Sequence, residues 1–186
     1  MNHSFEWVQA ALGIIVALGM TRLVTSIVQL HTLRRSVRID WVPIAWAINI
    51  FFLLLQFSWV FVALREIVKD WTFGLFLCLL GFVLLLYTAA ALVLPTTQAQ
   101  AGDDLGAWFR SDGRWALPFL ALYSLLAYFF NWYFAGASPA TNPASGLLVI
   151  LTATAFFATA RRLQAGAAVL SLALTVALVV QMCLPD

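Results

Sequence analysis

The sequence predicts an all-α, polytopic transmembrane helical bundle with six spans, and two observations carry this prediction. Of the 186 residues, 63% are hydrophobic and 10% are charged, whereas soluble domains are about 45–50% apolar and about 25% charged. The apolar residues also fall in long runs that end at charges or prolines, as membrane-spanning helices of roughly 20 residues do. We therefore expect a single transmembrane domain over residues 1–186, which excludes soluble enzymes and nucleic-acid-binding proteins.

The first four spans are expected at about 5–31, 41–64, 71–94 and 115–135. Two further Ala-rich runs, 144–160 and 165–184, are separated only by the four residues Arg161-Arg162-Leu163-Gln164. One bent helix through this segment would place two arginines in hydrocarbon, at about 2.5–3.5 kcal/mol each. We therefore predict that the four residues form a tight turn and that the last two spans pack as a close hairpin.

The distribution of cations predicts the orientation in the membrane. With six spans, seven arginines fall on one side, and only Arg65 and Lys69 fall on the other. Because cations are retained on the cytoplasmic side, both termini are expected outside the cytoplasm, with a bacterial inner membrane as the default location. The seven arginines are Arg34, Arg35, Arg38, Arg110, Arg114, Arg161 and Arg162.

The connection between the third and fourth spans, residues 95–116, is the only long one expected. Its stretch 103–110 begins with two aspartates, which are typical of the start of a helix. Leu105, Trp108 and Phe109 then share one face. We predict a short helix that lies flat at the cytoplasmic interface. An unstructured tether is the alternative.

The expected spans carry few groups that perform chemistry. None holds an Asp or Glu away from its ends, and carboxylate proton relays in transporters need one. His3 and His31 are 28 residues apart on one span, about 42 Å at 1.5 Å per residue, so they cannot ligate one metal or haem together. Cys78 and Cys183 match no metal-binding spacing. We expect no enzymatic activity, no cofactor and no metal site.

Polar side chains within the expected spans instead fall at two matched depths, estimated at 1.5 Å per residue. In the first layer, Arg22 lies about 9 Å and Asn49 about 10 Å from the cytoplasmic boundary of a ~30 Å hydrocarbon core. In the second layer, Gln56 and Asn131 both lie about 21 Å from the cytoplasmic starts of their spans. The candidate path-lining residues of the two layers are Arg22, Asn49, Gln56, Tyr87, Ser124 and Asn131.

Three interpretations of Arg22 are open. In the first, its long side chain reaches the cytoplasmic headgroups from this depth. In the second, Asn49 and a tyrosine hold it as a structural contact inside the bundle. In the third, it lines a water-filled path or meets an anionic ligand. Interhelical hydrogen bonding alone would also explain both layers without transport.

Small residues at helical spacing predict where helices approach closely in lipid. One such stripe, which includes Cys78, follows the third span, and another follows the sixth at intervals of four residues. The predicted helix-packing residues are Gly74, Gly81, Ala167, Ser171 and Thr175.

Two functions follow from these features. The first is a homo-oligomeric channel or small-solute conduit, in which the polar layers line or gate a path. The second is a non-catalytic accessory or scaffold subunit packed against a larger membrane complex, and handling of a lipid is a third class. Thr25, Ser26 and Gln29 share a face with Arg22, which favours the conduit. Expected partners are membrane lipids and either further copies of the chain or other membrane subunits, with no nucleic acid.

Overall fold

The computed structural model describes residues 3–68, 71–95, 104–135 and 143–183, and these residues are organised as helices. Five helices are long and apolar enough to cross a membrane, as expected for an integral membrane protein. The elements are α1 (His3–Thr32), α2 (Trp41–Ile67), α3 (Phe73–Val93), α4 (Leu105–Ser111), a 3-10 turn η1 (Gly113–Trp115), α5 (Ala116–Ala135), α6 (Pro143–Phe157) and α7 (Arg161–Cys183).

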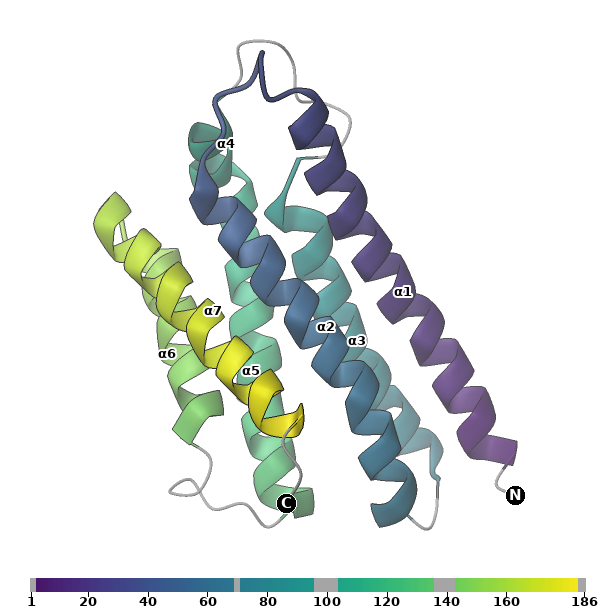
Figure 1. The fold of residues 1–186 in the computed structure, drawn as a ribbon. Coiled ribbons are helices and arrows are strands. Elements are labelled where there is room, and N and C mark those ends of the chain that lie inside the picture. Colours follow the sequence, from purple (N-terminus) through teal and green to yellow (C-terminus); the bar gives the residue numbers. More distant parts are fainter. Residues whose placement is uncertain (1–2, 69–70, 96–103, 136–142, 184–186) are drawn as a thin grey trace.

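The long helices run alternately in opposite directions, so that α1 begins and α7 ends at the same end of the bundle (Figure 1). The other end, here called the α4 end, carries α4, the α1–α2 connection and the α6–α7 turn. The chain therefore crosses between two ends as an up-and-down bundle, in the order expected from the sequence.

Helix α6 departs from the expectation of six full-length spans. It has 15 residues, which corresponds to about 22 Å at 1.5 Å per residue and is shorter than a ~30 Å hydrocarbon core. Five candidate spans and one shorter apolar helix are therefore what the described residues contain.

The predicted turn at Arg161–Gln164 is wrong, because these four residues form the first turn of α7. The chain reverses instead at residues 158–160. Gln164 stabilises this reversal, since its side-chain Nε2 donates to the carbonyl oxygen of Ala158 at 2.9 Å and its backbone N–H donates to Ala160 O at 3.2 Å. The expected α6–α7 hairpin does form, with the two helices packed against each other.

Five helices close into a ring in which α2 contacts α3, α3 contacts α5, α5 contacts α6, α6 contacts α7, and α7 returns to α2. Helix α1 packs against α2 and α3. α2 is the most buried of the candidate spans, with half of its most apolar stretch inside the protein. Trp46, Ile50 and Leu54 of α2 have no exposed surface. α2 is therefore the candidate span most enclosed by its neighbours.

The short helix predicted in the third connection is present as α4, and its N-cap is Asp104. Leu105 and Phe109 are buried and Trp108 is half-buried, so the predicted apolar face of α4 packs on the bundle. The backbone N–H of Leu105 also donates to Arg38 O at 3.1 Å, which ties α4 to the α1–α2 connection. Asp103, also predicted to belong to this helix, lies outside the described residues.

Candidate functional site

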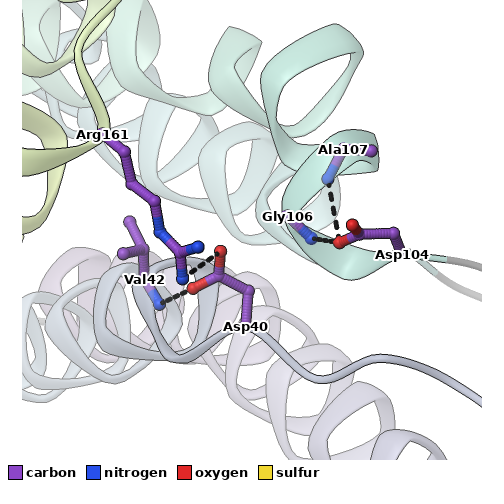
Figure 2. Close-up of polar contacts among 6 residues, drawn as sticks. All are labelled: Asp40, Val42, Asp104, Gly106, Ala107 and Arg161. Carbon is purple, nitrogen blue, oxygen red and sulfur yellow. Dashed lines mark hydrogen bonds and ion pairs between the residues drawn. The ribbon is translucent and has the colours of Figure 1, made fainter.

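Asp40 holds three elements together at the α4 end (Figure 2). Its Oδ1 accepts a hydrogen bond from the backbone N–H of Val42 at 3.1 Å, which caps α2. Its Oδ2 forms an ion pair with Arg161 Nη2, at the start of α7, at 3.1 Å. The Asp40 side chain is 10% exposed and that of Arg161 is 64% exposed. Each oxygen of this buried carboxylate at the start of α2 therefore has one partner: the backbone of α2 for Oδ1 and the Arg161 side chain for Oδ2.

Glycine at position 106 brings α4 against the same carboxylate. A Cβ atom at Gly106 would lie 2.5 Å from Asp40 Oδ2, closer than real contacts allow. Asp104 fixes the start of α4 independently, because its Oδ1 accepts from Gly106 N at 2.8 Å and Ala107 N at 3.2 Å (Figure 2). The hydrogen bonds from Ala107 and Gly106 lower the pKa of the Asp104 carboxyl below its ordinary value.

A polar core lies between α2 and α7, and it consists of Trp46, Asn49, Ser171 and Thr175, all with 0% exposure. Asn49 Nδ2 donates to Ser171 Oγ at 2.7 Å. Three other atoms of this core have no hydrogen-bond partner among the described residues: Trp46 Nε1, Asn49 Oδ1 and Thr175 Oγ1. Buried polar groups normally find partners, so the polar core is under-satisfied in this state.

The α2–α7 contact explains the small-residue stripe predicted on the last span. Ala167, Ser171 and Thr175 are all buried, and Ser171 bonds directly to α2. Of the three interpretations of Arg22, the one in which Asn49 holds it is not supported, because Asn49 Nδ2 donates to Ser171 of α7 and Arg22 donates to Ala91 O of α3.

A cavity of about 250 Å³, here called the central cavity, lies inside the ring in the half remote from α4. All five ring helices line it, through residues such as Gln56 of α2, Phe82 of α3, Asn131 of α5, Ser145 of α6 and Leu178 of α7. None of the described lining side chains carries a charge. The polar lining consists of Gln56, Tyr123, Ser124, Asn131 and Ser145.

Gln56 and Asn131 of the second predicted layer therefore line one cavity, together with Ser124, another of the candidate path-lining residues. Ser124 Oγ donates to Leu120 O of its own helix at 2.9 Å. Gln56 Nε2 is buried and has no partner in the part of the chain that the structure describes. The cavity thus offers at least one hydrogen-bond donor to a guest molecule.

Aromatic rings stiffen one wall of the central cavity. Phe82 makes edge-to-face contacts with Tyr123 at 5.8 Å and with Phe130 at 5.6 Å between ring centroids. Phe57 adds a third contact to Phe82 at 6.5 Å. Such arrangements are favourable for aromatic pairs and have defined geometry, so part of the cavity lining is a preformed cluster of aromatic rings.

A second cavity, here called the α4 crevice, has a volume of about 470 Å³ and lies between α1, α3 and α4. Arg22 lines it and donates from Nη2 to the carbonyl oxygen of Ala91 at 3.3 Å. Ala91 is in the last turn of α3, where carbonyl groups lack helical partners. Arg22 therefore directs its charge toward the α4 end and stabilises the end of α3.

The remaining predicted residues lie apart from both cavities. Tyr87 is half-buried on α3 and lines neither cavity. Among the described residues, a Cβ at Gly81 would meet no atom within 4 Å, and one at Gly74 would meet only the nearby Thr72 side chain; the helix-packing role of these two glycines stays a prediction. This stripe, with exposed Cys78, faces outward.

Within the described residues, no three His, Cys, Asp or Glu side chains lie close enough together to hold a metal ion. Comparison with family models, with curated proteins and with solved structures found no match to this chain. The chemistry of the two cavities therefore provides the basis for assigning a function.

The sequence signal for the Asp40 ion pair was weak. Asp40 directly precedes an apolar run, which is a typical N-cap position, but its partner Arg161 lies in a distant segment. The under-satisfied polar core was likewise visible only as isolated polar residues on two separate spans.

Proposed function

We propose that this chain is a membrane conduit for small uncharged solutes, with the central cavity as its solute-binding chamber. The observation that carries the proposal is the lining of that cavity, in which two carboxamides and three hydroxyl groups from three helices occur together with aromatic rings, and none of the described lining side chains is charged. Concave sites with a mainly apolar lining and a few convergent polar groups are typical of small-molecule binding. Uncharged donors and acceptors select uncharged, hydrogen-bonding guests.

The polar core is proposed as the closed part of the same path. It lies between the central cavity and the α4 end, and its side chains are fully buried. Leaving a buried polar group without a partner costs about 1–3 kcal/mol of stability. Three such atoms in an apolar interior therefore destabilise the fold, which favours a functional reason for their presence. A solute or water molecule that entered the polar core would satisfy them.

The membrane arrangement proposed for this conduit follows the arginines. All seven arginines of the expected cytoplasmic side lie in or next to the elements of the α4 end, while Arg65 is near the opposite end of α2. We place the α4 end in the cytoplasm and the mouth of the central cavity on the outer side, in a bacterial inner membrane. We further propose six crossings, in which the short α6 crosses as the partner of α7.

Solute flux into proteoliposomes tests the proposal. Light scattering after a jump in glycerol or urea should show faster re-swelling with the protein than without it. We expect Gln56→Leu combined with Asn131→Leu to lower the protein-dependent rate about tenfold, because losing hydrogen bonds worth about 1.4 kcal/mol in total raises the barrier by that factor. Gln9→Leu removes a carboxamide from an exposed position on α1 and should leave the rate unchanged.

Equal rates for protein-containing and empty liposomes would refute the conduit, and so would a double variant that transports as fast as the parent. Ion flux is a further discriminator, since an uncharged chamber should not pass potassium or chloride.

The outward-facing stripe on α3 favours a second candidate, in which the chain assembles with another membrane protein or with copies of itself. Small residues with open space above them allow a partner helix to approach closely, and both Gly74 and Gly81 have that space. The mass of the detergent-solubilised particle separates the two cases: a multiple of 20.6 kDa indicates a homo-oligomer, whereas unlike subunits indicate an accessory role.

Cross-linking through Cys78 tests this contact directly, because Cys78 is exposed on the same face of α3. In a Cys183→Ser background, a homo-oligomer that uses the stripe should form a Cys78-linked dimer in membranes. The same chain with Cys78→Ser is the control.

A further inference from the structure

The α4 crevice contains charges of both signs in a definite order. Arg22 is half-buried beside the last turn of α3, whereas Asp104 and Asp112 are exposed at the two ends of α4. Arg22 is half-buried, and its guanidinium donates one hydrogen bond to a described residue, the contact with Ala91 O. A guanidinium has five N–H donors, so its remaining capacity is directed into the crevice.

The two carboxylates are partly committed to local contacts. Asp104 uses Oδ1 to cap α4, and Asp112 Oδ2 accepts from Ser111 Oγ at 2.8 Å. Both residues are exposed, and each carboxylate retains acceptor capacity for a cation, since it has about four lone-pair sites. The crevice therefore presents an anion-binding group inside and cation-binding groups outside.

From this order we propose that the α4 crevice binds the headgroup of an aminophospholipid, with the phosphate at Arg22 and the primary ammonium at Asp104 and Asp112. In such a lipid the phosphate lies nearer the hydrocarbon and the ammonium lies farther out, which is the order of the charges in the crevice. Arginine binds phosphate through paired N–H donors. The acyl chains would then run along the exposed apolar faces of α1 and α3.

The same charges disfavour the other common headgroups. An anionic phospholipid without an amine would bring its headgroup against the carboxylates of Asp104 and Asp112 and supply no ammonium to them; Arg38 and Arg110, whose charges act on Asp104, do not line the crevice. A choline headgroup has no N–H donors for those carboxylates. Selectivity for a primary amine therefore rests on Asp104 and Asp112, while affinity for the phosphate rests on Arg22. The proposal is independent of solute transport through the central cavity.

Native mass spectrometry of the delipidated full chain tests the site, with phosphatidylethanolamine, phosphatidylglycerol and phosphatidylcholine of identical acyl chains in competition. We expect one phosphatidylethanolamine to bind with about tenfold preference, the factor that one charge-assisted contact of about 1.4 kcal/mol provides. Arg22→Gln should lower its occupancy about tenfold by the same reasoning. Arg35→Gln, an exposed arginine at the same end that does not line the crevice, should change nothing.

The combined exchanges Asp104→Asn and Asp112→Asn supply a second, milder test. Asparagine remains a good N-cap, so α4 should persist, and the preference for phosphatidylethanolamine over phosphatidylglycerol should disappear. This variant decides the question even if Arg22→Gln does not fold.

Equal binding of the three lipids, or an unchanged preference in the Asp variant, would overturn the proposal. Inorganic phosphate and soluble glycerophosphoethanolamine are added in a separate arm. Displacement of the lipid by inorganic phosphate alone would show a free-phosphate site, which also overturns the assignment to a lipid.

Discussion

Asp40, Asp104 and Arg22 at the α4 end have polar partners, whereas several buried polar groups in the interior of the helix ring have none among the described residues; Gln29 Oε1 of α1 is an unpaired exception near the α4 end. At the α4 end, the Asp40 carboxylate caps α2 and pairs with the first residue of α7. Asp104 caps α4, and Arg22 donates a hydrogen bond to a carbonyl group in the last turn of α3. Inside the ring, Trp46 and Thr175 each have a buried polar atom without a partner among the described residues. Paired groups stabilise the fold, whereas unpaired buried groups destabilise it, so the difference separates structural contacts from candidate functional ones.

The largest effect is expected where the α4 end is packed most tightly. Gly106→Ala would force its Cβ to within 2.5 Å of Asp40 Oδ2, so either α4 or the carboxylate must move. Overpacking of this kind costs about 1–3 kcal/mol, measured as the apparent free energy of unfolding during SDS titration. Gly166→Ala is the matched control, because it lies inside α7 with open space around it and should stabilise the helix by up to about 1 kcal/mol. Equal effects at the two positions would contradict this packing.

Removing the Asp40 carboxylate should have the next largest effect. Asp40→Ala removes the α2 cap and the Arg161 contact, with an expected loss of about 1–2 kcal/mol in the free energy of unfolding. Asp40→Asn retains a capping oxygen, so its loss should be smaller. Arg161→Gln should cost less than about 1 kcal/mol, because Arg161 is exposed and surface ion pairs contribute little. A loss from Arg161→Gln as large as that from Asp40→Ala would show that the ion pair, and not the cap, is the main contribution.

The polar core allows a paired and an unpaired hydroxyl group to be compared, since Ser171 has a hydrogen-bond partner and Thr175 has none among the described residues. Ser171→Ala should destabilise the protein by about 1 kcal/mol, because it leaves Asn49 Nδ2 without its acceptor. Thr175→Val removes an unpaired hydroxyl and should stabilise it by about 1 kcal/mol, while lowering solute flux. Thermal unfolding in detergent compares the two variants. Destabilisation by Thr175→Val would mean that Thr175 has a partner and that the polar core is purely structural.

The smallest effect concerns pH at the start of α4. Because hydrogen bonds to the carboxylate lower the Asp104 pKa in the folded protein, the cap is present at neutral pH and is lost as pH falls through that lowered pKa, below the ordinary value of about 3.9. As the pH falls through this range, the protection of the Gly106 and Ala107 amides against hydrogen exchange should therefore decrease in an additional step. In Asp104→Asn this step should be absent, and its persistence would point to another titrating group.

Depth along a helix could be predicted from the sequence, but the neighbours of a helix could not. Gln56 and Asn131 share one cavity, as their matched depths suggested, because the rise per residue of a helix is fixed. Arg22 and Asn49 also have matched depths, yet they contact Ala91 and Ser171 respectively. Helix rise fixes a level in the membrane, whereas the direction of each side chain depends on which helices are adjacent.

The start of α7 shows the same limit. Arginine residues between two apolar runs indicate a loop when they are considered alone, since a charge in hydrocarbon is costly. Arg161 is instead helical and pairs with Asp40 from the α1–α2 connection. That partner is brought close only by the contact of α7 with α2, which no local pattern in the sequence specifies.

The most direct measurement of the central claim is to block the central cavity chemically and follow solute flux. In a background with Cys78→Ser and Cys183→Ser, Asn131→Cys introduces a thiol at the cavity lining, and Gln9→Cys introduces one at an exposed position on α1. If the cavity is the solute chamber, a small uncharged thiol reagent should abolish the protein-dependent glycerol flux with Asn131→Cys and leave it unchanged with Gln9→Cys. Complete labelling of Asn131→Cys with undiminished flux would contradict the account.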